Sequence, residues 1–162
     1  MNRRTAFMLT GMTLLGLAIA AVPQAGFAQS SPLIGTWKLN LDKSTFSPGP
    51  PPRSQTSTYQ QDGQDIKLTT QGIDAQGNPT MGAIMQIYDG MPHPSTGNPN
   101  FDATAYTRVD ANNIIVSFFK AGKMVGIGRG VVSPDGKTNT FTAAGIDANG
   151  RPLNFILVYD KQ

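Results

Sequence analysis

Two nearly identical stretches, "GIDAQGNP" at 72–79 and "GIDANGRP" at 145–152, constrain the fold most strongly. Extended backwards without a gap, the alignment places Asp62-Gly63 over Asp135-Gly136. An Asp-Gly pair between alternating segments is typical of a tight β-hairpin, because glycine accepts the positive φ that such turns require. The repeated unit is therefore predicted to be strand, Asp-Gly turn, strand, longer turn, strand. Two such units predict two similar walls of one β fold.

The rest of the chain follows the same rhythm of strand-forming segments and short connections. Short connections between consecutive strands favour antiparallel neighbours, and no amphipathic helix of useful length is expected. The predicted strands are 36–41, 56–61, 66–70, 81–88, 103–109, 114–120, 124–132, 138–143 and 153–159. The fold class is thus all-β, an antiparallel up-and-down meander of about 8–9 strands that closes into a barrel and leaves no open edge. A two-sheet β-sandwich is the alternative.

The N-terminus has the pattern of a secretory signal peptide. Arg3 and Arg4 precede an apolar run at 6–22, and Gly26-Phe27-Ala28 places small residues where a signal peptidase cleaves. We predict a signal peptide at 1–28, a single domain at 29–162, and a periplasmic or secreted protein without an integral membrane segment after cleavage. A retained membrane anchor is the alternative, and the arginine pair leaves Sec and twin-arginine export both open.

Composition excludes several kinds of site. The absence of cysteine excludes disulfides and thiolate metal ligands. The formal charge of +3 includes both signal-peptide arginines, so the remaining domain is nearly neutral and does not predict nucleic-acid binding. Asp74, Gln76 and Asn78 alternate like calcium ligands, but no acidic residue closes that loop, and turn chemistry explains them better. No metal or cofactor is expected.

The segment "GTWKLN", with Gly35-Thr36-Trp37, resembles the Gly-x-Trp signature of the calycins, the superfamily of lipocalins and fatty-acid-binding proteins. The longer stretch "GTWKLNLDKSTFSPGP" resembles the start of small exported bacterial proteins of uncharacterised function. The resemblance implies a lipocalin-like barrel that binds a small apolar molecule inside. It also implies that Trp37 closes one barrel end beneath a basic side chain, for which Arg151 and Lys161 are the candidates.

The segment 124–132 suggests a polar anchor for such a ligand. Val125, Ile127, Arg129 and Val131 share one face of the strand, and glycines occupy most of the other. An inward apolar face would bury Arg129, which a ligand carboxylate would then satisfy. Arg108 and Tyr106 share a face of another strand, and they and Tyr88 complete the predicted ligand-binding residues. The alternative reading places both arginines on the solvent face or pairs them with Asp102 and Asp110.

An apolar lining is predicted for the interior of the barrel, with core filling as the alternative reading of the same side chains. The residues concerned are Met81, Met85, Met124, Phe118, Phe141, Phe155 and Leu157.

The segment 88–102 is the longest predicted loop and contains His93, the one histidine. Asp89, His93 and Ser95 are the elements of a hydrolytic set, but no nucleophile turn accompanies them, and residues so close in one loop rarely orient one another as a triad. No catalytic residue is predicted, and the protein is expected not to be an enzyme.

Together these features predict an exported, non-catalytic protein that holds a small apolar or amphipathic ligand inside a barrel. Two alternatives stay open: a ligand-free envelope or interaction protein that acts through its loops, and an enzyme of unrecognised type on the same scaffold.

Overall fold

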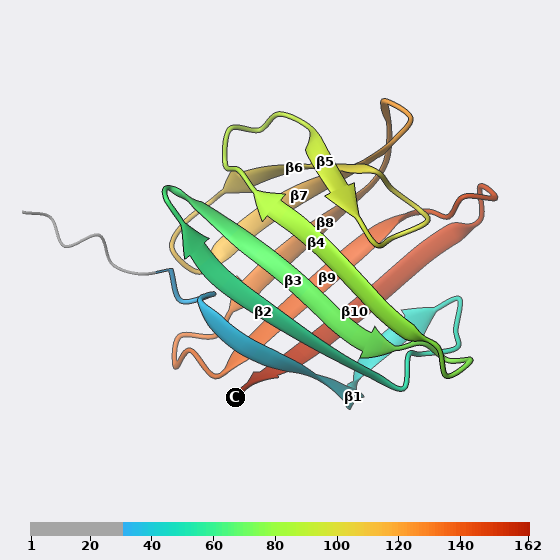
Figure 1. Ribbon diagram of the computed structural model, residues 1–162, viewed down its shortest axis with the longest axis horizontal. Coiled ribbons are helices and arrows are strands. Elements are labelled where there is room, and N and C mark those ends of the chain that lie inside the picture. The colour runs from blue at the N-terminus through green and yellow to red at the C-terminus, as the bar shows by residue number, and fades with distance from the viewer. Residues whose placement is uncertain (1–30) are drawn as a thin grey trace, which may run out of the picture.

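Ten antiparallel strands close into one barrel in the computed structural model, which describes residues 31–162 (Figure 1). Each strand pairs with its neighbours in the sequence, and the first and last strands pair with each other. The strands are β1 (Gly35–Ser47), β2 (Ser54–Asp62), β3 (Asp65–Ile73), β4 (Pro79–Gln86), β5 (His93–Thr96), β6 (Ala103–Arg108), β7 (Asn113–Lys120), β8 (Lys123–Val132), β9 (Thr138–Ile146) and β10 (Pro152–Lys161). The predicted closed meander is confirmed, and the sandwich alternative is not supported.

The barrel has one strand more than the nine predicted ones. Strand β5 lies inside the segment 88–102 that was predicted to be a loop, and it pairs through only two residues on each side. Pro94 and the surrounding glycines and prolines hide this short strand from a search for alternating patterns. The predicted signal peptide, residues 1–28, lies outside the described residues. Among residues 31–162, no helix is long and apolar enough to cross a membrane.

The repeated stretches form the same turn twice. Asp74 Oδ1 accepts the backbone N–H of Asn78 at 2.7 Å, and Asp147 Oδ1 accepts the backbone N–H of Arg151 at 2.9 Å. In both turns the aspartate also exchanges backbone hydrogen bonds with the residues that follow it. The two aspartates therefore act as the local caps of the β3–β4 and β9–β10 turns, as turn chemistry predicted.

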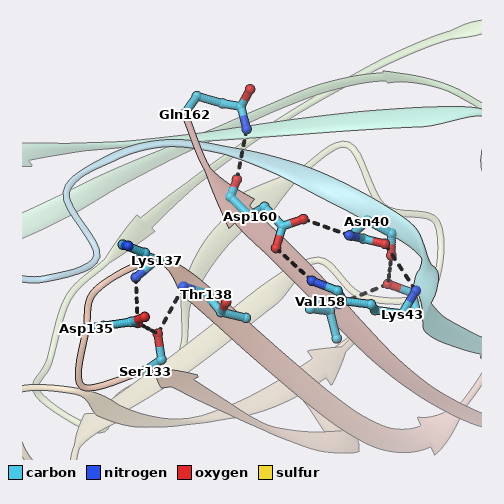
Figure 2. A network of polar contacts seen from close by, with 10 residues as sticks. Asn40, Lys43, Ser133, Asp135, Lys137, Thr138, Val158, Asp160 and Gln162 are labelled. Carbon is cyan, nitrogen blue, oxygen red and sulfur yellow. Dashed lines mark hydrogen bonds and ion pairs between the residues drawn. The ribbon is translucent and has the colours of Figure 1, made fainter.

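The seam between β1 and β10 closes the barrel. The register shifts between Asn40 and Thr45, which leaves a bulge in β1. Polar side chains bridge this bulge: Asn40 Nδ2 donates to Asp160 Oδ2 at 2.7 Å, and Ser44 Oγ accepts the backbone N–H of Val158 at 2.9 Å. Figure 2 shows Asn40 and Lys43 of β1 reaching Asp160 of β10. Side chains of β1 thus bond to β10 where the backbone ladder is interrupted.

Successive strands run in opposite directions, so their connections lie alternately at the two ends of the barrel. One end, here called the closed end, carries the β2–β3, β6–β7 and β8–β9 turns and the start of β1. Trp37 is fully buried there, and its indole Nε1 donates to the carbonyl of Leu33 at 2.7 Å. The other end, here called the mouth, carries the β3–β4 turn at 74–78, the segment 97–102 and the β9–β10 turn.

Candidate ligand-binding cavity

The barrel encloses a cavity of about 340 Å³ that extends from the mouth toward the closed end. Pro52, Asp74 and Asn98 line its mouth. Apolar side chains, among them Leu68, Ile84, Ile114 and Leu157, form much of its wall. A volume of this size lies within the usual range of small-molecule sites, roughly 300–1,000 Å³. The interior is therefore not completely filled by core side chains.

The inner part of the cavity is polar. We call its residues the polar floor: Tyr59, Gln86, Tyr106, Asn139 and Tyr159. All five are buried, and they come from the closed-end portions of β2, β4, β6, β9 and β10. Each occupies an inward position of its strand, because side chains alternate between the two faces of a sheet. The floor thus gathers phenols and amides from five strands around one space.

Hydrogen bonds hold some of these groups. The hydroxyl of Tyr159 accepts Nε2 of Gln55 at 2.7 Å, and the hydroxyl of Tyr88 donates to Oε1 of Gln86 at 2.9 Å. Asn139 Oδ1, by contrast, is buried and has no partner among the described residues. Ser95 Oγ and Thr104 Oγ1 are also buried without partners. A buried polar atom without a partner is costly, so these atoms require water or a ligand.

The floor carries no charge at neutral pH. Burial raises the pKa of Tyr59 and of Tyr106 well above the ordinary value of 10.0, and it raises the pKa of Tyr159 to about 12. Nearby hydrogen-bonding side chains offset these pKa shifts only in part. The phenols therefore act as neutral donors and acceptors.

Four phenylalanines form an aromatic row toward the mouth, Phe101, Phe118, Phe141 and Phe155. Successive ring centroids lie 4.7, 6.3 and 6.5 Å apart. All four line the cavity. Phe118, Phe141, Phe155 and Leu157 thus occupy the predicted apolar lining. Among the methionines predicted there, Met81 reaches the rim but is 73% exposed, and Met124 is 55% exposed.

The inward face of β8 explains how the large rings fit. Gly128 and Gly130 point into the barrel, and a Cβ at Gly128 would lie 2.6 Å from Cζ of Phe141 and 3.1 Å from Cγ1 of Val116. The glycines therefore leave room for neighbouring side chains. The opposite face of β8, with Ile127, points outward and is partly exposed.

The predicted inward orientation of Arg129 is therefore wrong. Arg129 is exposed on the outer surface of β8, and its Nη2 donates to Oδ1 of Asn113 at 2.8 Å. The apolar residues that share its face do not indicate the core, because this face of β8 is exterior and the small residues are interior. Solvent satisfies the guanidinium without a ligand.

The structure brings the other three predicted ligand residues together, but at the closed end. Tyr88 lies between Arg108 and Tyr106: its ring centroid is 4.2 Å from the Arg108 guanidinium carbon and 6.2 Å from that of the Tyr106 ring. Of the three, only Tyr106 lines the cavity. Arg108 is exposed and stacks on Tyr88 as a cation–π pair.

The cation above Trp37 is Lys161 and not Arg151. Lys161 Nζ lies 5.0 Å from the centre of the Trp37 ring and 3.2 Å from the Pro32 carbonyl, to which it donates. Arg151 lies in the mouth-end turn, where its Nε donates to Oδ2 of Asp147 at 2.7 Å. The register explains the difference, because Lys161 is the residue of β10 that pairs with Trp37.

His93, the first residue of β5, does not form a triad. Asp89 Oδ2 lies 2.9 Å from His93 Nε2, but Ser95 Oγ has no hydrogen-bond partner and so is not bonded to the imidazole. The described part of the chain also contains no group of three metal-ligating His, Cys, Asp or Glu side chains. Asp74, which alternates with Gln76 and Asn78 like a calcium ligand, accepts hydrogen bonds from Asn78 instead.

Sequence reasoning missed most of the polar floor. Gln86, Asn139 and Tyr159 lie in predicted strands, but each is an ordinary polar or amphipathic residue with no motif around it. The available signal was the spacing of residues along β2. Tyr59, Ser57 and Gln55 are each two residues apart, so they share one face of the strand, and that inward face is polar along its length. Only closure of the barrel shows that this face is interior.

Comparison with known proteins finds a likeness of fold. No family model matches the chain, and no curated protein matches it. The solved structure of zebrafish ileal bile acid-binding protein complexed with cholic acid is similar, with a TM-score of 0.50 and 10% identity over 82% of this chain and 100% of that one. A redesigned β-barrel, mFAP1, bound to DFHBI, aligns with a TM-score of 0.39 and 13% identity over 80% of this chain and 95% of that one. The first likeness supports the barrel that the calycin resemblance implied.

Proposed function

We propose that this protein is an exported, non-catalytic binding protein that holds a small apolar or amphipathic molecule inside its barrel. The observation that carries the proposal is the cavity of about 340 Å³ with apolar walls above a buried polar floor. An apolar pocket with a few convergent polar groups is the usual form of a small-molecule site. The similar zebrafish barrel was solved in complex with cholic acid, which supports ligand binding by a barrel of this fold.

Export, to the periplasm or the medium, belongs to the same proposal and rests on the signal-peptide pattern at 1–28. A ligand-free role is less well supported, since a filled barrel would leave no such cavity. An enzymatic role is also less well supported, because the described residues that line the cavity include no histidine and no cation, and the Asp89–His93 pair lies outside it.

A matched pair of variants tests the proposed binding site. Leu157 lines the cavity, whereas its neighbour Ile156 points outward and is 42% exposed. We expect Leu157→Trp to obstruct the cavity and to weaken binding of the neutral fluorophore N-phenylnaphthylamine at least about tenfold, and Ile156→Trp to leave binding within about twofold. Equal binding by both variants, or no binding by the unmodified protein, would contradict the proposal.

A further inference from the structure

The polar character of the cavity indicates which ligands it selects. Polar atoms line the cavity from Gln55 and Ser57 on β2 down to the floor. Among the described residues in its lining there is no lysine, arginine or histidine, and the one ionisable carboxylate is Asp74 at the mouth. The interior therefore offers hydrogen bonds but no positive charge.

An ionised ligand group would be poorly accommodated at the floor. A buried charge is normally paired with an opposite charge, and hydrogen bonds to neutral groups replace only part of its hydration. The phenols of Tyr59, Tyr106 and Tyr159 stay protonated and can donate hydrogen bonds, but the described lining holds no cation, and the carboxylate of Asp74 would repel a second negative charge that passes the mouth. A carboxylate, sulfonate or phosphate would thus lose more on entry than the floor returns.

The floor also specifies the direction of one hydrogen bond. Asn139 is 3% exposed and lines the cavity, and its Oδ1 accepts no hydrogen bond from the described residues. An amide oxygen can only accept, so a ligand that satisfies it must carry an O–H or N–H donor, and the side chains that cover Oδ1 must shift to admit that donor. The aromatic row lies toward the mouth, where it would contact the apolar body of the same ligand.

We infer that the cavity selects uncharged ligands that have an apolar body and a hydroxyl or N–H donor at one end, with that donor bound to Asn139 Oδ1. This inference rests on the proposed binding function and adds the chemical class of the ligand. It also replaces the anionic ligand that an interior Arg129 would have required, because that arginine is on the outside.

Three ligands with one apolar body test the inference: decanol, decyl methyl ether and decanoate, each measured by displacement of N-phenylnaphthylamine at neutral pH. We expect decanol to bind at least about tenfold more tightly than decanoate, because the floor has no cation, and at least about threefold more tightly than the ether, because the ether has no donor. Decanoate binding as tightly as decanol would overturn the inference. If the probe itself does not bind, the proposed function fails instead.

The variant Asn139→Leu identifies the acceptor. It removes the whole amide at similar volume, including Oδ1 and the hydrogen bond to Tyr59, so we expect the advantage of decanol over the ether to fall to within about twofold while the ether still binds, which shows an intact cavity. An unchanged preference for decanol would overturn the assignment to Asn139.

The variant Arg53→Ala controls for the opposite ligand orientation. Arg53 is an exposed cation at the mouth, where a Cβ on Gly77 would lie 3.2 Å from its Nη1. We expect decanol affinity to be unchanged in this variant. Tight decanoate binding that depends on Arg53 would show that the ligand's polar end lies at the mouth, and would contradict the inference.

Discussion

The ring of Phe141 lies against Gly128, so closely that a Cβ at Gly128 would come within 2.6 Å of Phe141 Cζ. In this contact between β8 and β9, the Phe141 ring occupies space that a side chain at Gly128 would need. It also fixes the faces of β8: the glycines point inward, and Arg129 points outward.

The variant Gly128→Ala tests this packing. The added methyl group must displace the Phe141 ring, and such overpacking costs about 1–3 kcal/mol of the free energy of unfolding. We expect that loss in chemical denaturation, together with weaker binding of N-phenylnaphthylamine. The control is Arg129→Ala, one residue further along β8 on the outer surface, which should change stability by no more than about 0.5 kcal/mol. A larger effect at Arg129 than at Gly128 would reverse the assigned faces.

The fluorescence of Trp37 tests whether Lys161, and not Arg151, is the cation above its ring. Lys161→Ala removes the cation 5.0 Å from the Trp37 ring centre, so we expect a loss of about 0.5–1 kcal/mol of stability and a red shift of the Trp37 emission as the indole becomes hydrated. Arg151→Ala should leave the emission spectrum unchanged. A shift with Arg151→Ala alone would show that the wrong cation has been assigned.

The buried phenols predict a loss of stability at alkaline pH. An unfolded tyrosine deprotonates near its ordinary pKa of 10.0, whereas burial raises the pKa of folded Tyr159 to about 12. The folded state therefore binds this proton more tightly. The stabilisation by the protonated Tyr159 phenol is present below pH 10.0 and is lost as the pH rises toward about 12. Thermal unfolding measured across this range should show a steep fall that becomes shallower in Tyr159→Phe. Identical slopes for both proteins would contradict the burial of this phenol.

The repeated turn predicts sensitivity to acid. The backbone N–H of Arg151 is the main cause that holds the pKa of Asp147 below its ordinary value, and the Arg151 side chain adds to it. This stabilisation is present above the ordinary pKa of 3.8 and is lost as the pH falls through the lower folded pKa. Asp147→Ala should therefore lower the Tm at neutral pH and lower it much less in acid.

The matched control for this turn is Asp42→Ala, which removes an exposed carboxylate of β1. We expect its Tm to stay close to that of the unmodified protein at both pH values. If both variants behave alike, Asp147 does not cap its turn.

Local turn chemistry made the barrel predictable from the sequence. Asp62-Gly63, Asp135-Gly136 and the two repeated stretches fixed hairpins along the chain, and short connections left few ways to order the strands. Strand β5 was missed because two residue pairs on each side leave too little pattern to detect.

The site was much less predictable, for a physical reason. Alternation separates the two faces of a strand, but it does not say which face is inside when small residues line the interior, as Gly128 and Gly130 do. The polar floor has the same difficulty, since Asn139 and Gln86 are residue types usually found on the surface. Their role depends on five strands that surround one cavity, and the sequence of a single strand does not show which other strands lie across from it.

Native mass spectrometry of the protein purified from its own cells tests directly whether the barrel holds a small molecule. We expect the unmodified protein to carry a small molecule that dissociates on activation and that is uncharged with a hydroxyl or N–H group. We expect Leu157→Trp to lack this molecule and Ile156→Trp to retain it. A mass equal to that of the bare chain, unchanged after exposure to a lipid and metabolite extract, would contradict the binding function.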